Sequence, residues 1–240
     1  MKQRPPRPRE KFVRKTGPGM QMATNADATD NITIVAAASL PTQPWWPKLH
    51  TAIIEAFLHT PENVTVFPPD WKRLPDGSTT AGHSLAAELG DRGHFAVLLE
   101  QGQPIACGGV LPYRGDSWIN DAQSGKSDAD IANAVDSGSS NNEGVREWEI
   151  CCFCVSATHR GQGISRRLLD FLKDFTKARG AQRLYASYAE IETGRFWPRM
   201  DFEVIPGAGG MLKKGFKVDA EKEGLRGDVV FSMAVKTLRL

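Results

Sequence analysis

The chain has 240 residues, of which 40% are hydrophobic and 24% charged, a composition typical of a globular domain with a sizeable core. No apolar run approaches the roughly 18 residues that a membrane-spanning helix needs, so the sequence excludes a transmembrane protein and we expect no membrane partner. The net charge of +2 combines a mildly acidic body with a basic N-terminus, because residues 1–20 hold seven Lys or Arg and one Glu. This distribution argues against a nucleic-acid-binding face on the body of the protein.

Residues 1–30 are predicted to form a disordered, basic, Pro-rich tail. The segment lacks the apolar stretch of a secretory signal, and Pro5, Pro6, Pro8 and Gly17 would interrupt the amphipathic helix of a mitochondrial presequence. A tail that contacts nucleic acid or a membrane surface, or that acts as another targeting segment, is the alternative to solvated disorder.

The cysteines indicate a reducing compartment. Four of them in a chain of this length do not make a disulfide framework. Cys151, Cys152 and Cys154 crowd one apolar run, which indicates buried thiols. No His or Cys is spaced around them as in a zinc site, and we expect no metal. The sequence therefore predicts a cytoplasmic protein, with the nucleus as the alternative location.

The remainder, residues 31–240, is predicted to be a single domain. Hydrophobic periodicity and turn residues define its elements. The first half is predicted to contain, in chain order, a strand over 31–37, a helix that follows Pro44 and ends near 58, a Pro-rich loop over 61–78, a weaker helix over 80–89, and two strands over 94–100 and 104–111 joined by a tight turn.

Residues 114–143 then shift to Ser, Asn, Asp and Gly, which predicts a flexible insertion. Gly180 follows the clearest helix, at the position of a C-cap glycine. The mixed order of elements predicts an α/β (α+β) fold, a mixed central sheet with helices on both faces, and not a doubly wound sheet. The second half is predicted to contain a strand over 147–155, helices over 163–177 and 190–199, and strands over 183–187, 202–205 and 229–235.

The turn between the strand over 147–155 and the next helix carries the clearest chemical motif. Residues 160–165 read Arg-Gly-Gln-Gly-Ile-Ser. Glycines let backbone amides point into a concavity, and the first amides of a helix favour a phosphate or pyrophosphate. A tight connection without a ligand would use the same glycines. The motif is not a P-loop, since no Lys follows, and Arg166 stands where a dinucleotide motif needs its third Gly.

This segment resembles the acetyl-CoA pyrophosphate loop R/Q-x-x-G-x-G/A of the GNAT-family N-acetyltransferases, with Ser165 where Gly or Ala is usual. Residues 196–202, Phe-Trp-Pro-Arg-Met-Asp-Phe, resemble the family's F-Y-x-K-x-G-F. The order of elements agrees with the family fold over about 200 residues. The resemblance implies a GNAT-like fold and acetyl-CoA as co-substrate.

The resemblance also implies how acetyl-CoA binds. In this family the strand before the loop splays from its neighbour, and pantetheine lies in the cleft, where Cys154 and Val155 would bond it through their backbone. An amine attacks the acetyl group directly, without a covalent enzyme intermediate. The residues that would hold the pyrophosphate are Arg160, Gly161, Gln162, Gly163, Ile164 and Ser165.

Glu149 is the candidate general base, because it matches the base glutamate in the histone-type branch of the family, and Glu147 is the second candidate. An ammonium acceptor must lose a proton before it can attack. Two Glu at the start of a strand are otherwise an ordinary solvated end. Strand alternation predicts one shared face of the sheet for Glu147, Glu149, Cys151, Phe153 and Val155. The apolar residues on that face would be neighbours that suit a general base.

The predicted function is direct acetyl transfer from acetyl-CoA to a primary amine of a small molecule, a lysine or an N-terminus. Trp197 stands where many family members have a Tyr that serves the departing thiolate. An indole does not release its proton, so a catalytically weak or inactive acyl-CoA-binding regulatory module is the alternative. Tyr188 is the one Tyr near the matching segment.

The acceptor is an amine-bearing molecule whose identity the motifs leave open. Acidic residues in the insertion at 114–143 favour a cationic acceptor such as a polyamine, an aminoglycoside-like compound or a lysine, unless that insertion is only a solvated loop. Trp45, Trp46 and Trp71 belong to the core or line an acceptor pocket, and core packing is the favoured interpretation. We expect a monomer or a homodimer.

Overall fold

The computed structural model describes residues 31–57, 65–116, 118–124, 126, 146–217 and 223–238. The tail predicted over residues 1–30 and most of the insertion predicted over 114–143 lie outside these residues. In chain order the described residues form β1 (Asn31–Ala36), η1 (Ala37–Thr42), α1 (Trp46–Phe57), α2 (Ser78–Leu89), β2 (His94–Glu100), β3 (Gln103–Pro112), α3 (Trp118–Gln123), β4 (Glu147–Val155), η3 (Ala157–His159), α5 (Ile164–Lys177), β5 (Arg183–Ala189), α6 (Glu190–Thr193), α7 (Phe196–Arg199), β6 (Glu203–Leu212) and β7 (Val229–Thr237).

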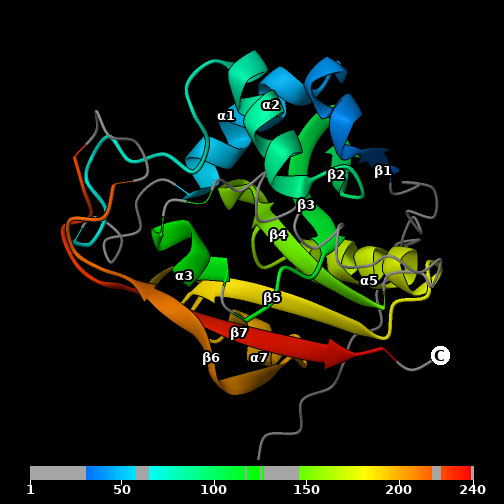
Figure 1. Cartoon of the computed structure of the whole chain (residues 1–240). Helices are drawn as coiled ribbons and strands as arrows, with labels where there is room; N and C mark the ends of the chain where they lie inside the picture. Colours follow the sequence, from blue (N-terminus) through cyan, green and yellow to red (C-terminus); the bar gives the residue numbers. More distant parts are fainter. Residues whose placement is uncertain are drawn as a thin grey trace, which may run out of the picture.

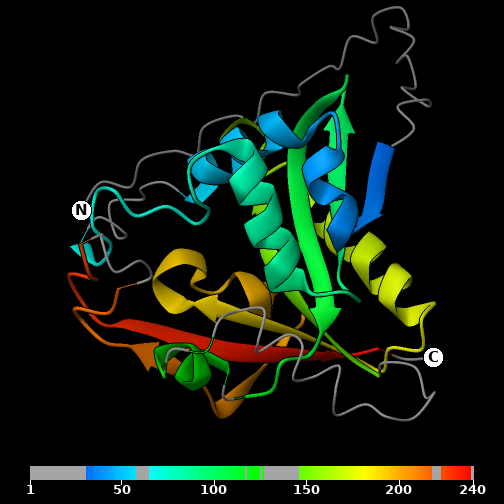
Figure 2. The ribbon, with the colours of Figure 1, turned by 45° about the horizontal axis from the view of Figure 1, so that its top comes forward.

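The strands form one mixed sheet of seven in the described chain, in the order β1-β2-β3-β4-β5-β7-β6. The β4–β5 pair is parallel, and the other neighbours are antiparallel. Helices α1 and α2 lie on one face and α5 on the other (Figures 1 and 2). The predicted fold class, a mixed sheet covered on both faces, is thereby confirmed.

Two hydrophobic cores follow from this layering, one on each face of the sheet. Leu168 and Leu172 of α5 lie in the first core with Ile150 of β4. Leu49 of α1 and Leu85 of α2 lie in the second. Because β2 and β3 are covered on both sides, most of their residues are buried, and their sequences are continuous apolar runs instead of alternating ones.

Helix α5 is the element that carries the predicted binding loop, and its ends agree with the sequence. It begins after Gly163, whose φ of +79° is left-handed. At its end Gly180 has a φ of +87°, and the amide of Ala181 donates to the carbonyl of Thr176 over 3.1 Å. A glycine in this conformation just after the last turn ends the helix, as predicted.

A β-bulge interrupts β4 in its middle. Cys154 pairs with Cys107 of β3, and Cys151 pairs with Gly109, so two residues of β4 oppose one residue of β3. Cys152 absorbs the extra length with a φ of +46°. A bulge of this kind changes the face that every following side chain points to.

The bulge overturns the prediction that the odd-numbered residues of this strand share one face. Cys151 packs in the core beneath α1 and α2, whereas Phe153 and Val155 pack against the core beneath α5. Cys154 is therefore on the same side as Cys151. Strand alternation alone does not reveal such a shift, because no glycine marks it in the sequence.

Two further elements differ from the prediction. The helix predicted over 190–199 is two short helices, α6 and α7, separated at Gly194, whose φ is +51°. Helix α3 lies within the segment predicted to be a flexible insertion and contacts β6. Among the described residues, none of the helices has the length and apolar character needed to cross a bilayer.

Candidate active site

The site begins where β4 and β5 stop pairing. Their parallel register runs from Glu147 opposite Arg183 to Ile150 opposite Ala186. Beyond this point β4 continues to Val155 and β5 continues to Ala189, but the two strands no longer pair with each other. The edge of β4 that faces β5 beyond this point is therefore open to a ligand backbone, and the predicted splay is confirmed.

A cavity of about 390 Å³ lies at the open end of β4. Most of the residues predicted to bind acetyl-CoA line this cavity, but Gln162 and Gly163 do not. The predicted residues that do line it are Cys154, Val155, Arg160, Gly161, Ile164 and Ser165. The structure thus brings the end of the strand and the predicted pyrophosphate loop to one wall of one cavity.

The loop before α5 has the geometry of an anion site. Gly161 and Gly163 both have positive φ, +76° and +79°, a region that side chains rarely adopt. The amide of Arg167 donates to the carbonyl of Gly163 over 3.2 Å, so the amides that precede it have no acceptor in the helix. Their partial positive charge and the helix dipole favour an anion.

Arg160 adds a full positive charge at this loop. Its Nε donates to the carbonyl of Val155, and an Nη donates to the carbonyl of Ala56, each over 3.3 Å. Both acceptors are neutral, so these bonds orient the guanidinium without cancelling its charge. The geometry suits a pyrophosphate next to the start of α5.

A second cavity, of about 290 Å³, adjoins the first. Helix α6, the bulged part of β4 and the end of α1 separate the two. The residues that line both cavities are Phe57, Phe153, Glu192 and Thr193. A molecule in each cavity would therefore meet beside these four side chains, and Glu192 is the one titratable group among them.

Glu192 is a half-buried residue whose carboxyl group has no ion pair among the described residues. Its Oε1 is buried and has no hydrogen bond among the described residues. Burial raises the pKa of Glu192 from its ordinary value of 4.5 to about 7, against the opposing positive charge of Arg73. A carboxylate with that pKa is half ionised near neutral pH and can accept a proton there.

Glu149 has the opposite surroundings. It is fully buried, and Arg114 donates from Nε to its Oε2 over 3.1 Å and from Nη2 to its Oε1 over 2.7 Å. The chain of charges continues, since Arg114 lies 4.0 Å from Glu88, which accepts two bonds of 2.7 Å from Arg73. The apolar surroundings predicted for Glu149 are therefore wrong, and it lines neither cavity.

Glu147, the second predicted base, is at the other end of β4. Its carboxylate accepts hydrogen bonds from Arg183 over 3.0 Å and from the hydroxyl of Tyr185 over 3.1 Å. It lines neither cavity. The structure does not bring Glu147 together with the predicted acetyl-CoA loop.

The sequence of residues 60–202 matches the model of the acetyltransferase (GNAT) family. The chain belongs to this family. No curated protein sequence matches it.

Solved acetyltransferases share the fold at low identity. An agmatine N-acetyltransferase is 14% identical, with a TM-score of 0.51 over 87% of this chain and 100% of that one. An aminoglycoside 6'-N-acetyltransferase complexed with coenzyme A is 12% identical, with a TM-score of 0.50 over 87% and 97%. A polyamine N-acetyltransferase of Drosophila melanogaster is 14% identical, with a TM-score of 0.50 over 87% and 100%.

The four cysteines of this GNAT domain lie close together; Cys107, Cys151 and Cys152 are buried and Cys154 is half-buried. The Sγ atoms of Cys107 and Cys154 are 3.4 Å apart, and Cys151 and Cys152 line the second cavity. Burial raises the pKa of the Cys107 and Cys151 thiols well above their ordinary value. They are therefore protonated packing groups, and the described residues contain no cluster of three or more metal-ligating side chains.

Trp197, at the family's tyrosine position, is 4% exposed and lines the second cavity. Its Nε1 is buried without an acceptor in the described chain. Tyr188 lines the same cavity, and burial together with the charge of Glu190 raises its pKa. Trp45 and Trp46 belong to the core beneath α1 and α2, whereas Trp71 lines the second cavity.

Sequence reasoning missed Glu192 and Arg114. Glu192 lies five residues before Trp197, so its proximity to the second family motif was the available signal. Arg114 carried no signal, because it stands at the start of a segment assigned to a solvated insertion. Which carboxylate receives a guanidinium depends on how β3 and β4 align, and one sequence does not contain that register.

Proposed function

We propose that this GNAT protein transfers an acetyl group from acetyl-CoA to a primary amine, with Glu192 as the general base. One observation carries the proposal: the two cavities at the splayed end of β4 share Glu192, a half-buried residue whose buried Oε1 has no hydrogen-bond partner among the described residues. The proposed unit is the single domain over residues 31–240.

The first cavity is the proposed acetyl-CoA site. Its open strand edge, its two positive-φ glycines and the Arg160 guanidinium suit a ligand that has a peptide-like arm and a pyrophosphate. Bound there, acetyl-CoA supplies an acetyl thioester, whose transfer to an ammonium yields an amide, coenzyme A thiol and one free proton. The CoA complex of the aminoglycoside acetyltransferase supports this assignment by analogy of fold.

The second cavity is the proposed acceptor site. An amine enters it as an ammonium, which has no lone pair. Glu192 takes one proton and releases it to solvent, and the amine nitrogen is then a nucleophile. The second proton that the nitrogen loses ends on the thiol sulfur. Since burial raises the pKa of Glu192 to about 7, the carboxylate is basic enough for this step and still ionised in half of the molecules at pH 7.

We assign Glu149 and Arg114 to positioning. Their paired charges fasten the end of β3 to β4 beside the second cavity. A carboxylate that accepts two guanidinium bonds has few lone pairs left for an acceptor amine. The base role predicted for Glu149 from sequence stays a rival prediction, to be tested beside that of Glu192.

Thiol release from acetyl-CoA with a panel of primary amines tests the proposal. We expect turnover with at least one amine, and a loss of about 100-fold or more in kcat for Glu192→Gln, a magnitude typical of a removed general base. Glu190→Gln is the matched control, because Glu190 lies on the same short helix but is exposed. The Glu149→Gln variant separates the two candidates: a larger loss there than in Glu192→Gln would contradict the assignment.

The alternative function is an acyl-CoA-binding module without turnover, and Trp197 is the observation that favours it. An indole at this position cannot protonate a thiolate. Calorimetry with coenzyme A distinguishes the two: binding without thiol release for any amine supports the module. Absence of both binding and turnover would remove the first cavity as a CoA site.

A further inference from the structure

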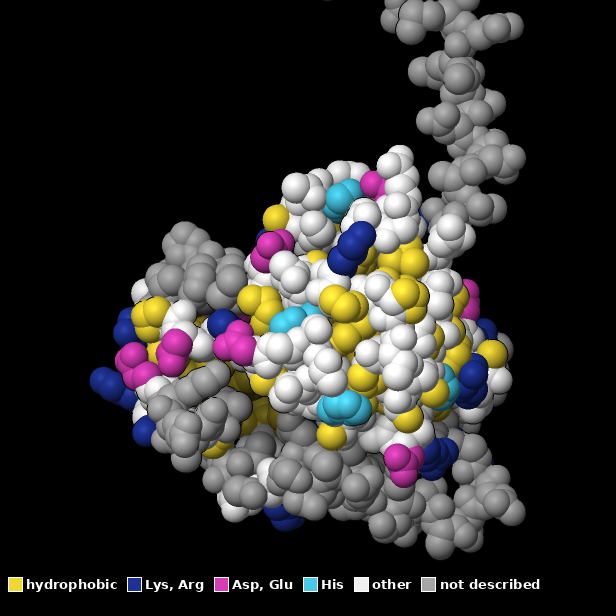
Figure 3. All heavy atoms as spheres, turned by 90° about the horizontal axis from the view of Figure 1, so that it is seen from above, with side chains coloured by type: hydrophobic (Ala, Val, Ile, Leu, Met, Phe, Trp, Pro, Cys, Tyr) yellow, Lys and Arg dark blue, Asp and Glu magenta, His cyan; other side chains and the backbone are white. Residues whose placement is uncertain are grey.

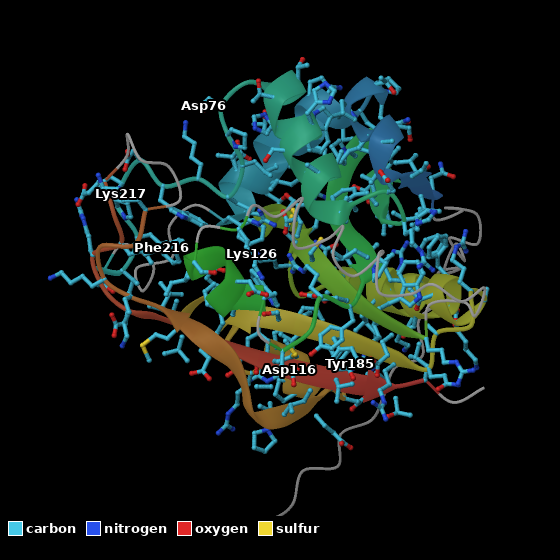
Figure 4. All side chains as sticks on the ribbon, viewed as in Figure 1. Asp76, Asp116, Lys126, Tyr185, Phe216 and Lys217 are labelled. Atoms are coloured by element: carbon cyan, nitrogen blue, oxygen red, sulfur yellow. The ribbon has the colours of Figure 1, made fainter. Side chains whose placement is uncertain are left out.

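The second cavity is rich in aromatic rings. Nine of its 23 lining residues are Phe, Trp or Tyr, so flat apolar surfaces form a large part of the wall. The rings of Phe67 and Trp71 lie 4.4 Å apart, and both belong to a cluster with Phe216 and Phe231. Phe216, labelled in Figure 4, lines this cavity together with Trp118 of α3, and Trp118 packs edge-on against Phe231.

Buried polar atoms without a partner gather at the same cavity. In the part of the chain that the structure describes, they are one atom each of Trp118, Ser187, Glu192 and Trp197, and all four residues line the cavity. A buried polar group without a hydrogen bond destabilises the fold by about 1–3 kcal/mol. Their concentration in one place indicates a ligand site, not a defect of core packing.

The charges around the cavity leave room for one cation. Each of the three basic residues of the wall is paired: Lys72 with Asp76, Arg73 with Glu88 and Arg114 with Glu149. The remaining acid of the wall is Glu192, which has no ion pair in the described residues. A single ammonium beside Glu192 would therefore complete the charge balance, whereas a second or third ammonium would meet guanidinium groups.

The described acids of the predicted insertion, which favoured a cationic acceptor in the sequence, lie outside the second cavity. Asp116 accepts a hydrogen bond from Tyr113, and Figure 4 places it near Tyr185 over β5 and β7. Asp121 pairs with Lys126 over 3.0 Å. Neither acid lines the second cavity, and the other acids of residues 127–145 lie outside the described residues. On the face seen in Figure 3, charges of both signs are interspersed.

We propose that the acceptor is an arylalkylamine, a primary amine that has one positive charge on its ammonium group and a neutral aromatic ring joined to it by an alkyl arm. This inference rests on the proposed function, since it names what the second cavity holds while Glu192 receives the proton. The ring stacks against aromatic side chains at the far wall, and its alkyl arm carries the ammonium to the junction of the two cavities. Ring pairs of this kind are stronger than apolar contact alone.

An amine panel at saturating acetyl-CoA tests the substrate class. Tryptamine and phenethylamine represent aromatic monoamines, hexylamine an aliphatic one, and spermidine a polycation. We expect kcat/KM to be about 10-fold higher for the aromatic amines than for hexylamine and lowest for spermidine. An equal or higher value for hexylamine or spermidine would overturn the aromatic class while leaving acetyl transfer intact.

A pair of variants tests the ring contact. Phe216→Leu removes a ring from the cavity wall and is expected to lower kcat/KM for tryptamine about 5- to 10-fold, with the KM for acetyl-CoA unchanged. Phe175→Leu is the matched control. Phe175 is a half-buried ring on α5 that packs against His94 and Arg179, and it lines neither cavity. Equal effects of the two variants would contradict the proposal.

The panel also distinguishes failure of this inference from failure of the proposed function. Turnover of amines in a different order of preference overturns only the arylalkylamine class. Coenzyme A binding without turnover of any amine in the panel overturns acetyl transfer to amines, and the acceptor class with it.

Discussion

Two glutamates near the second cavity, the fully buried Glu149 and the half-buried Glu192, have opposite surroundings. Glu149, on β4, has a guanidinium on both carboxylate oxygens. Glu192, in the helix that follows β5, has a buried oxygen with no hydrogen bond in the described chain. Burial alone therefore does not distinguish the two carboxylates; the hydrogen-bond partner separates the one that we assign to structure from the one that we propose for proton transfer.

The physical reason is the cost of removing a charge from water. A carboxylate held by a guanidinium keeps its charge in the interior, because attraction and hydrogen bonds offset desolvation. A carboxylate without such a partner keeps its proton until a higher pH, which is the case for Glu192. Removal of one partner or one charge from these two sites should therefore have effects of different size and different pH dependence.

Loss of Arg114 is expected to have the largest effect on stability. Its side chain is 3% exposed and that of Glu149 is fully buried, so Arg114→Met leaves a buried carboxylate without its guanidinium, at a cost of about 3–5 kcal/mol in the free energy of unfolding. Urea denaturation at pH 7 measures it. The double variant Arg114→Met/Glu149→Met removes both charges and should recover a large part of the loss; a double variant no more stable than the single one would contradict the pairing.

Glu192→Gln is expected to stabilise the protein, but only at high pH. Between pH 4.5 and 7 the unfolded chain has lost the Glu192 proton while the folded chain still holds it, so the stability of the wild type falls as pH rises. A neutral Gln avoids this cost. We expect the variant to match the wild type at about pH 4, below both pKa values, and to exceed it by about 2 kcal/mol at about pH 8.

Denaturant midpoints of both proteins across this range give the difference directly. Other titrating groups are common to the two and cancel in the comparison. A wild type that remains as stable as Glu192→Gln at pH 8 would mean that Glu192 has a charged partner in the folded protein.

Glu147→Gln is expected to have the smallest effect. Glu147 is 41% exposed in its pair with Arg183, and ion pairs of this kind contribute little to stability. We expect an unchanged denaturant midpoint and an unchanged kcat. A substantial loss of kcat in this variant would restore Glu147 as a catalytic residue and contradict the assignment of proton transfer to Glu192.

Much of this fold could be predicted from the sequence because its signals are local. The apolar pattern of the sequence indicates the strands β2 and β4 and the helix α5. Gly161 and Gly163, which have positive φ in the structure, already mark the loop in the sequence. The site required more. The extra residue at Cys152 turned the following side chains to the other face, and the pairing of Arg114 with Glu149 depends on contacts across 35 residues of sequence.

The family motif marked residues of the cavity proposed for acetyl-CoA and did not mark those of the cavity proposed for the acceptor. Phe67 and Trp71 come from the loop before α2, and Phe216 comes from the segment after β6. These parts of the chain are far apart in sequence and meet at the second cavity. Helix α3 is a similar case, since its residues carry little apolar periodicity and are held by contacts with β6. Tertiary packing, which a single sequence does not display, decides these elements.

The pH dependence of kcat/KM for a turned-over amine, in the wild type and in Glu192→Gln, tests the central assignment most directly. The wild-type rate is predicted to rise with pH through an apparent pKa near 7, the value to which burial raises the pKa of Glu192, and this limb is predicted to be absent from the variant. A variant that keeps the same limb at an undiminished rate would show that another group accepts the proton.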